Sequence, residues 1–500
     1  MAAAAWLAGC QPAVDTTASE TGSTSAAGAH HFGSIDFEPC SLTSVGGGET
    51  TEAKCATLQV PENAAEPAGR QIALNIAWLA PASGTAAADP VFFLAGGPGQ
   101  AATQHAASVR RMLGEVGKQR NIILVDQRGT GQSNPLDCRA ADGSPLLLDP
   151  MKQPSDADSV AYTRQCIAGL DDRADPRFYA TTDAVRDLDA VRAALGAATI
   201  NLVGVSYGTR VAQQYASTYP EHTRSVVLDG VVPNELVVGG EFANTLEDAL
   251  GLQSAQCREN PACAKRYPTD MRAQLRTVMT TLRDAPVEVD YRDSRTNLAR
   301  RDTITADAVG SLAFMFSYAP QTASLLPLTV DEAAHGRYAP LMSLVQMSAE
   351  QMQGQMSRGM QWSVVCTEDA GRYTPDPSAT ATIIGSELSA AFFAPCAQWP
   401  HVPAPAEFSR PFASDRPVLL LSGELDPVTP PRYGEQVAAH LPNGRHLVLK
   451  GQGHNVSAIG CLPKLLGQFL ETADAKALDA ACLDNLSYVP PFVNFNGWSP

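Results

Sequence analysis

The sequence predicts an α/β fold, in which a mostly parallel sheet is covered by helices and a largely helical domain is inserted between two strands. Short, continuous apolar runs are typical of strands that are buried on both faces. Such runs occur at residues 91–95, 121–125, 200–205, 225–228 and 418–421. Helical segments separate them, and this alternation indicates a parallel sheet. The strand rhythm stops between Pro233 and about Pro411, so we expect the inserted domain there.

Four other segments predict two further strands and two helices. Residues 56–60 and 71–78 alternate between polar and apolar side chains, which predicts two strands, the second antiparallel and at a sheet edge. Residues 183–195 place apolar side chains on one helical stripe, with Thr182 or Asp183 as the N-cap. The Met-rich stretch 341–356 also has a helical pattern, and we interpret it as packing within the inserted domain.

These patterns divide the chain of 500 residues into five parts. A leader-like segment and an Ala-, Ser-, Thr- and Gly-rich flexible tether come first, and a lid domain interrupts the α/β core. The predicted parts are 1–10 (leader), 11–34 (tether), 35–232 (core, first part), 233–410 (helical lid) and 411–500 (core, second part).

The acidic composition excludes one class of partner. The formal net charge is −16 and no run of Lys and Arg interrupts the sequence. Because an acidic surface repels phosphate, we expect no nucleic-acid partner. No stretch beyond the leader approaches the roughly 20 apolar residues of a membrane span. Zinc-protease and phosphate-loop motifs are also absent from the sequence, so we expect no metal and no cofactor.

The leader and the cysteines predict an oxidising compartment. Residues 7–10, Leu-Ala-Gly-Cys, resemble a bacterial lipoprotein cleavage site with Cys10 as the lipidated residue. The leader lacks a basic region and is short, so either translation begins upstream of Met1 or the likeness is accidental. If Cys10 carries lipid, the ten other cysteines fall into neighbouring pairs, namely Cys40/Cys55, Cys138/Cys166, Cys257/Cys263, Cys366/Cys396 and Cys461/Cys482. We therefore expect disulfides and a periplasmic or cell-surface protein that is lipid-anchored.

Ser206 is the candidate nucleophile. It lies in Gly204-Val-Ser-Tyr-Gly208, between an apolar strand-like run and a helical segment. This strand, turn and helix sequence holds a serine on a tight elbow with its hydroxyl exposed at the carboxyl edge of the sheet. The alternative is a serine that only caps the helix, so the interpretation depends on the partners found elsewhere.

Asp426 and His454 complete a candidate triad. A serine needs a base that accepts its proton and an acid that orients the base. Asp426 follows the apolar run 418–421, and His454 lies in a glycine-bounded loop after the next predicted strand. The chain order Ser, Asp, His is the one expected of an α/β-hydrolase core. Glu424 is an alternative acid, but we favour Asp426 because it lies farther from its strand and closer to the histidine loop.

An oxyanion hole is predicted at the turn after Leu94. The turn contains Gly96, Gly97 and Gly99, which let the backbone approach a substrate carbonyl. We expect the oxyanion to bind the backbone N–H of Tyr207 and one from this turn, that of Gly97, with Gly96 as the alternative.

Several motifs together resemble the prolyl and tripeptidyl aminopeptidase family of α/β-hydrolases. These are residues 96–99 (Gly-Gly-Pro-Gly), 126–133 (Asp-Gln-Arg-Gly-Thr-Gly-Gln-Ser), the Ser206 elbow, 423–430 (Gly-Glu-Leu-Asp-Pro-Val-Thr-Pro) and 451–454 (Gly-Gln-Gly-His). The likeness runs from about Phe37 to Cys482. Residues 55–61 and 363–369 are similar to the tripeptidyl branch, with its characteristic C-terminal region. Ala95 departs from the pattern, because prolyl relatives have a histidine there.

The resemblance implies hydrolysis of short peptides from the free N-terminus through an acyl-enzyme, without a cofactor. Such a site needs a carboxylate that recognises the α-ammonium group, and we favour Glu368. Other candidates are Asp369, Glu235, Glu241 and Glu247. We interpret Asp126 and Arg128 as a structural pair that supports the oxyanion turn. The alternatives are an esterase or lactonase with the same triad, and a binding protein without activity.

Overall fold

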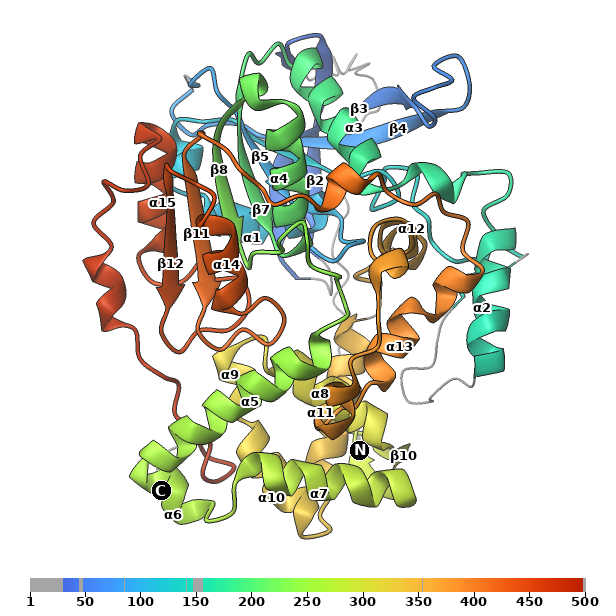
Figure 1. Cartoon of the computed structure of the whole chain (residues 1–500), viewed down its shortest axis with the longest axis vertical. Helices are drawn as coiled ribbons and strands as arrows, with labels where there is room; N and C mark the ends of the chain where they lie inside the picture. The colour runs from blue at the N-terminus through green and yellow to red at the C-terminus, as the bar shows by residue number, and fades with distance from the viewer. Residues whose placement is uncertain are drawn as a thin grey trace, which may run out of the picture.

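The computed structural model describes residues 30–44, 48–84, 86–140, 142–146, 156–352 and 354–497. The predicted leader with Cys10, and residues 11–29 of the tether, lie outside this range. A sheet with helices beside it forms one part of the molecule, and a group of helices forms the second part below it (Figure 1). The predicted α/β fold with a helical lid is confirmed.

The central sheet has ten strands in the order β1-β2-β3-β4-β6-β5-β7-β8-β11-β12. From β6 to β12 neighbouring strands are parallel, whereas β1 to β4 are antiparallel and β4 pairs antiparallel with β6. The strands are β1 (His30–Phe32), β2 (Ile35–Thr43), β3 (Thr50–Pro61), β4 (Gln71–Leu79), β5 (Val91–Leu94), β6 (Ile122–Val125), β7 (Ile200–Val205), β8 (Thr223–Asp229), β11 (Val418–Gly423) and β12 (Gly444–Leu449).

The position of β4 corrects one prediction. The strand is antiparallel as expected, but it lies inside the sheet between β3 and β6 and not at an edge. Its residues from Ile72 to Ile76 alternate between buried and half-buried because one face packs on the core and the other is only partly covered there, and Ala77 is buried as well. The first hairpin, β1 and β2, extends the sheet beyond β3 and forms that edge.

Helices cover both faces of the sheet and create two apolar cores. One core contains side chains of α3, α4 and α14, and the other contains side chains of α1 and α15. The helices of this part are α1 (Ala106–Met112), α2 (Asp156–Ala168), α3 (Thr181–Ala194), α4 (Tyr207–Thr218), α14 (Pro431–Ala438) and α15 (Leu462–Thr472). Helix α3 begins two residues before the predicted start, and Asp183 accepts a hydrogen bond from the Ala180 N–H, at 3.1 Å.

The lid has its own apolar core. It contains a two-stranded antiparallel sheet in addition to helices. Its elements are α5 (Phe242–Glu259), α6 (Pro261–Arg266), α7 (Met271–Asp284), β9 (Val287–Arg292), β10 (Ala299–Ile304), α8 (Ala306–Phe316), α9 (Pro320–Ala323), α10 (Leu326–Ala334) and α11 (Ala339–Met352). Leu341 and Met342, within the Met-rich stretch, are buried in this core.

The last part of the predicted lid packs on the α/β core. Helix α12 (Arg358–Glu368) contributes Met360, Trp362 and Val364 to the core that also contains α3 and α4. Trp399, after α13 (Glu387–Phe393), joins the same core. By packing, α12 and Trp399 therefore belong with the α/β core, although they lie before the predicted boundary at residue 410. Ala379, Ile383 and Ile384, between them in the sequence, pack in the lid core.

Residues 30–34 differ from the prediction. The sequence places them in the tether, but His30–Phe32 forms a strand that pairs with Ile35–Phe37. The Phe32 and Trp78 rings lie 5.2 Å apart, and the Ser34 N–H donates to Ala194 O at 2.8 Å. These contacts fix the segment, which corrects the predicted boundary.

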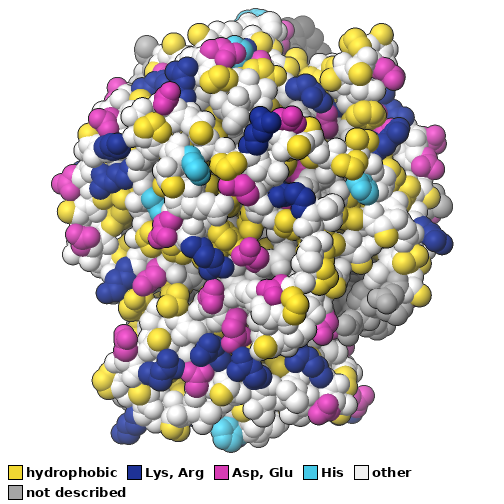
Figure 2. Space-filling view, viewed as in Figure 1, with side chains coloured by type: hydrophobic (Ala, Val, Ile, Leu, Met, Phe, Trp, Pro, Cys, Tyr) yellow, Lys and Arg dark blue, Asp and Glu magenta, His cyan; other side chains and the backbone are white. Residues whose placement is uncertain are grey.

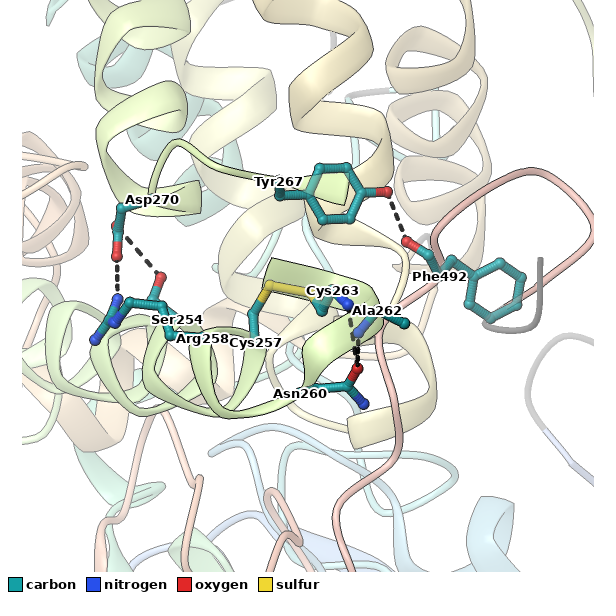
Figure 3. The surroundings of a disulfide bond; sticks show 9 residues. All are labelled: Ser254, Cys257, Arg258, Asn260, Ala262, Cys263, Tyr267, Asp270 and Phe492. Atoms are coloured by element: carbon teal, nitrogen blue, oxygen red, sulfur yellow. Dashed lines mark hydrogen bonds and ion pairs between the residues drawn. A yellow bond between two sulfur atoms is a disulfide. The ribbon is translucent and has the colours of Figure 1, made fainter. Parts of the chain in front are cut away.

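All five predicted cysteine pairs are disulfides in the structure. Cys257–Cys263 joins the end of α5 to α6 in the lid (Figure 3). Between them, the Asn260 side chain accepts hydrogen bonds from the N–H groups of Ala262 and Cys263, at 3.0 and 3.1 Å, and so caps α6. A disulfide and an N-cap therefore fix this corner of the lid.

The C-terminal segment runs from the core back to the lid (Figure 1). On the core side, the Tyr488 hydroxyl donates to Glu424 Oε1 at 3.1 Å. On the lid side, the Phe492 N–H donates to Ser324 O at 2.9 Å, and the Tyr267 hydroxyl donates to Phe492 O at 2.6 Å, close to the Cys257–Cys263 disulfide (Figure 3). This segment, residues 487–497, links the two parts and is called the C-terminal strap below.

The face of the molecule in Figure 2 is mixed in charge and also carries scattered hydrophobic side chains. Figure 2 shows acidic and basic side chains interspersed over one face of both parts. In the described part of the chain, no helix combines the length and apolar character needed to cross a membrane.

Candidate active site

Ser206 occupies a sharp turn between β7 and α4. Its φ and ψ of 56° and −125° place it in a backbone region that a non-glycine residue rarely adopts, as expected of a strained elbow. Gly208 and Gly204 make the turn possible. A Cβ at Gly208 would lie 2.2 Å from Leu94 O, and one at Gly204 would lie 2.3 Å from Gly208 O. Only glycine fits at these two close approaches, which explains the Gly-x-Ser-x-Gly pattern.

Asp426 and His454 meet at the carboxyl edge of the sheet. His454 Nδ1 lies 2.7 Å from Asp426 Oδ2, and both side chains are buried. A carboxylate only accepts hydrogen bonds, so Nδ1 carries the proton and Nε2 is left as a proton acceptor. The backbone N–H groups of Val428 and Thr429 each donate to Asp426 Oδ1 at 2.8 Å, which fixes the carboxylate.

Burial and charge act in opposite directions on this pair. Burial raises the pKa of Asp426, but the charge and hydrogen bond of His454 outweigh it, so the pKa of Asp426 lies below its ordinary value. Burial lowers the pKa of His454, but the charge and hydrogen bond of Asp426, together with the charge of Asp229, outweigh it and raise the pKa. The pair therefore stabilises a protonated imidazole, as a general base requires after it takes a proton.

The backbone around Asp229 and Gly230 connects the serine to the histidine. The Ser206 N–H donates to Asp229 O at 2.8 Å. A Cβ at Gly230 would lie 2.9 Å from Cε1 of the His454 ring. The elbow and the imidazole therefore flank the same two residues at the end of β8. The structure brings Ser206, Asp426 and His454 to one region of the carboxyl edge, as the sequence predicts.

The predicted oxyanion turn lies against the serine. A Cβ at Gly96 would lie 3.0 Å from Ser206 Cβ, so Gly96 passes directly beside the elbow. Gly97 has a φ of 109°, which favours glycine. Tyr207 is the first residue of α4, where backbone N–H groups have no acceptor within the helix. The turn and the helix start thus provide the two sources of N–H groups that the sequence predicts.

Two lid segments contact the site directly. The Tyr318 carbonyl, after α8, accepts from the His454 N–H at 2.7 Å, and the Tyr318 ring lies edge-on to the imidazole at 5.1 Å. The Gly99 carbonyl of the oxyanion turn accepts from the Ser357 N–H at 2.9 Å, just before α12. The lid therefore packs directly against both the histidine loop and the oxyanion turn.

The predicted pairing of Asp126 with Arg128 is wrong. Asp126 accepts hydrogen bonds from Thr103, Asn75 and Gln132, and Arg128 instead forms a bidentate pair with Asp187 of α3, at 2.6 and 2.7 Å. The two side chains leave the turn in different directions because each finds buried partners on another element. Asp126 still supports the segment after the oxyanion turn through Thr103.

Glu368 is buried, and its carboxylate contacts Thr181 and Arg210. Only 4% of the residue is exposed. Its Oε1 accepts from the Thr181 N–H at 2.8 Å, and its Oε2 lies 3.5 Å from Arg210 Nη1. Burial raises the pKa of Glu368 to about 7, although Arg210 acts against this. These contacts favour a structural role, while its role as the ammonium ligand stays a prediction.

The alternative acid Glu424 has other partners. Its Oε2 accepts from the Gly451 N–H at 2.8 Å, and its Oε1 accepts from the Tyr488 hydroxyl at 3.1 Å. It therefore orders the chain on either side of the histidine loop, and Asp426 is the acid that contacts His454.

A cavity of about 520 Å³ separates lid helix α5 from the loop that carries Asp426. Among the described residues that line it, Asp426 is the one member of the predicted triad. The charged residues of its lining are four acids and two arginines, namely Glu247, Asp248, Glu424, Asp426, Arg272 and Arg432. Arg272 pairs with Glu247, Arg432 pairs with Asp248, and the Asp426 side chain is buried against His454, so Glu424 is the remaining acid of the lining.

Three residues with contacts in this site were not predicted. Thr429 donates from its hydroxyl to Asp426 Oδ2 at 2.8 Å and lies 3.1 Å from His454 Nδ1. Its place three residues after Asp426 is a local turn signal that sequence reasoning did not use. Tyr318 is in the lid and Asp229 ends a different strand, so only the tertiary structure brings them to the histidine.

The chain is similar to several known proteins. A family model described as alpha/beta hydrolase fold matches residues 89–459. Serine protease Hip1 of Mycobacterium tuberculosis is 27% identical over 493 residues, covering 90% of this chain and 91% of that protein. Tripeptidyl aminopeptidase of Streptomyces lividans is 31% identical over 192 residues, 36% of this chain and 35% of that protein. Carboxylesterase B of M. tuberculosis is 33% identical over 229 residues, 43% of this chain and 44% of that protein.

Proposed function

The chain belongs to the α/β-hydrolase family, and on that basis we propose that it is a serine exopeptidase that cleaves peptides from their free N-terminus. The observation that carries the proposal is the Ser206 elbow beside the buried pair of His454 and Asp426, joined at 2.7 Å. The similarity to a serine protease along 90% of the chain supports peptide-bond hydrolysis.

In the proposed mechanism each residue has one role. Ser206 Oγ attacks the substrate carbonyl carbon while its proton moves to His454 Nε2, and Asp426 holds the Nδ1–H and stabilises the imidazolium. The N–H groups of Tyr207 and Gly97 receive the oxyanion. His454 then donates its proton to the leaving amine, which leaves an acyl-enzyme on Ser206. Water, deprotonated by His454, attacks this ester and releases the acyl product.

Two observations support the choice of an exopeptidase. The lid contacts the histidine and the oxyanion turn, which favours short peptides over folded proteins. Glu424 lines the cavity beside Asp426 and has no basic partner among the described residues, and a negative charge there attracts an α-ammonium group. The partial similarity to a tripeptidyl aminopeptidase points in the same direction.

An esterase is the second candidate function. The same triad hydrolyses esters, and 43% of the chain is similar to a carboxylesterase. The two functions differ in what they need at the amine end of the substrate, because an esterase does not require a free ammonium group.

Paired chromogenic peptides test the proposal. We would measure hydrolysis of free and N-acylated peptides of one to three residues, and of simple esters, by wild type and Ser206→Ala. The expected result is activity on free peptides that the substitution abolishes. Equal rates on free and N-acylated peptides would overturn the exopeptidase assignment, and activity confined to simple esters would support the esterase.

We also propose that the protein is exported and that lipid on Cys10 anchors it to a membrane. Five disulfides support an oxidising compartment. Mass analysis of the mature N-terminus tests the anchor, with a diacylated Cys10 as the expected result. An N-terminus without lipid at Cys10 would refute the anchor but not export.

A further inference from the structure

Asp229 is a buried carboxylate that the triad chemistry does not use. It is the last residue of β8, which lies between the strand of the nucleophile, β7, and the strand of the acid, β11. Asp229 pairs with Val205 on one side and with Leu421 on the other. Its residue is 1% exposed. The topology therefore places this carboxylate at the centre of the catalytic edge.

The carboxylate of Asp229 binds the chain just after the catalytic histidine. The Val456 N–H lies 3.0 and 2.9 Å from its two oxygens, and the Ser457 N–H donates to Oδ2 at 2.9 Å. The Ser457 hydroxyl donates to the same oxygen. Asn455, with a φ of 67°, turns the chain between His454 and these donors. Burial raises the pKa of Asp229, whereas the hydrogen bonds from Ser457 and Val456 and the charge of His454 act in the opposite direction. Because every hydrogen bond at this carboxyl group is donated to it, these contacts favour its ionised form.

The main chain of the same residue holds the nucleophile. The Asp229 carbonyl accepts from the Ser206 N–H at 2.8 Å, and the following Gly230 N–H donates to Leu421 O at 3.0 Å. One residue thus fixes the elbow through its backbone and the histidine loop through its side chain. A shift of Asp229 would move the base relative to the serine.

The charge of Asp229 is not neutralised by a basic side chain. Within the described part of the chain, no Lys or Arg forms an ion pair with it. The groups in contact with the imidazole are Asp426 after β11, the Thr429 hydroxyl and the Tyr318 ring of the lid. Asp229, the last residue of β8, acts on the imidazole through its charge. Both acids therefore act on the same cation, the His454 imidazolium.

We propose that Asp229 is a positioning residue of the catalytic machinery, which holds the histidine loop against the nucleophile elbow and stabilises the imidazolium with a second negative charge. Asp229 stabilises the imidazolium at the step in which the Ser206 hydroxyl proton moves to His454 Nε2 and the serine oxygen bonds to the electrophile. The imidazole then gains a positive charge, which Asp426 contacts directly and Asp229 stabilises from the β8 side. The inference rests on the proposed serine chemistry, but not on the exopeptidase specificity.

The test is the pH dependence of inactivation by a fluorophosphonate, which reacts with an activated serine and requires no peptide. We would compare wild type with Asp229→Asn, since Asn keeps the shape of the side chain and removes its negative charge. The second-order rate constant should fall about tenfold on the neutral plateau. The acid limb should move to lower pH by about one unit, because removing a negative charge lowers the pKa of His454.

A second pair of variants covers the case in which Asp229→Asn does not fold. Ser457→Ala removes a donor to Asp229 and should slow inactivation by about threefold to tenfold, whereas Ser457→Thr keeps the hydroxyl and should stay within about twofold of wild type. Thermal unfolding of each variant checks that the fold is intact.

The outcomes separate the two proposals. A folded Asp229→Asn variant with an unchanged plateau and acid limb would overturn the role of Asp229 and leave the proposed function standing. If that variant does not fold, a rate for Ser457→Ala equal to that of wild type overturns the role. No reaction of wild type with the reagent would overturn both, and equal hydrolysis of N-acylated peptides would overturn only the exopeptidase.

Discussion

Arg210 and Asp369 form a fully buried ion pair beside the nucleophile elbow, with Arg210 Nη1 at 3.0 Å from Asp369 Oδ2. Arg210 lies one turn after Ser206 in α4, and Asp369 follows α12. The pair therefore attaches the elbow helix to the segment that connects the lid with the core. Arg372 also contacts Asp369, at 2.9 Å, so the acid has two basic partners.

Arg210→Met is expected to lower the free energy of unfolding by about 3 to 5 kcal/mol, because it leaves Asp369 and Glu368 with too little positive charge in the interior. Denaturant unfolding measures the change. The control is Arg301→Met, which breaks an exposed pair with Asp290 and should leave stability within experimental error. Equal stability of Arg210→Met and wild type would contradict the importance of the buried pair.

Asp426→Asn is expected to lower the hydrolysis rate by about 10⁴-fold, because an amide stabilises neither the Nδ1–H tautomer of His454 nor the imidazolium. Glu424→Gln is the matched control. Glu424 binds Gly451 and Tyr488 and not the histidine, so its variant should keep a rate within about threefold of wild type. The reverse order of effects would make Glu424 the acid of the triad.

The acid limb of the pH–rate profile should lie above pH 6.5. His454 accepts a proton from Ser206 only when it is neutral, and its pKa is raised above the ordinary value of 6.5 by Asp426 and Asp229 despite burial. Activity is therefore lost as the pH falls through this raised pKa. The pH dependence of kcat/KM should be measured with an ester that has no amino group. Such a substrate does not titrate in this pH range, so the acid limb reports the enzyme alone. A limb centred below pH 6.5 would contradict the expected electrostatics.

Glu368→Gln is expected to flatten the pH dependence of stability. Burial raises the pKa of Glu368 from 4.5 to about 7, so the folded protein binds more protons than the unfolded chain between these values. The protonated Glu368 side chain contributes to the free energy of unfolding at low pH, and this contribution is lost as the pH rises through about 7. Unfolding in denaturant at about pH 5 and about pH 8 should show a smaller difference for the variant than for wild type.

The same variant tests amine recognition. Because Glu368 is engaged by Thr181 and Arg210, we expect Glu368→Gln to keep the preference for free over N-acylated peptides. The ratio of the two kcat/KM values measures this preference. A loss of the preference, with the rate on N-acylated peptides unchanged, would instead establish Glu368 as the ammonium ligand that the sequence predicts.

The catalytic edge could be predicted because of a property of parallel sheets. Ser206, Asp426 and His454 each follow a predicted strand, and the carboxyl ends of parallel strands meet at one edge. The local patterns of apolar runs and glycines were therefore sufficient to bring these residues together. The disulfides could be paired for a similar reason, since each joins cysteines that are neighbours in the sequence.

Long-range partners could not be predicted in this way. Asp126 and Arg128 are two residues apart, which suggested a pair, but Arg128 binds Asp187 of α3, 59 residues further along the chain. The packing of α12 on the core was hidden for a related reason. Its sequence has the same helical pattern as the lid helices, and only the tertiary structure shows which apolar surface buries Met360 and Trp362.

The C-terminal strap has a practical consequence for anyone who handles this protein. Its hydrogen bonds with Ser324 and Tyr267 attach the end of the chain to the lid, which itself contacts His454 and Gly99. An affinity tag or fusion partner placed at this end would lie next to the lid segments that hold Phe492. Tags at this terminus should therefore be cleavable, and activities of tagged preparations compared with the untagged enzyme.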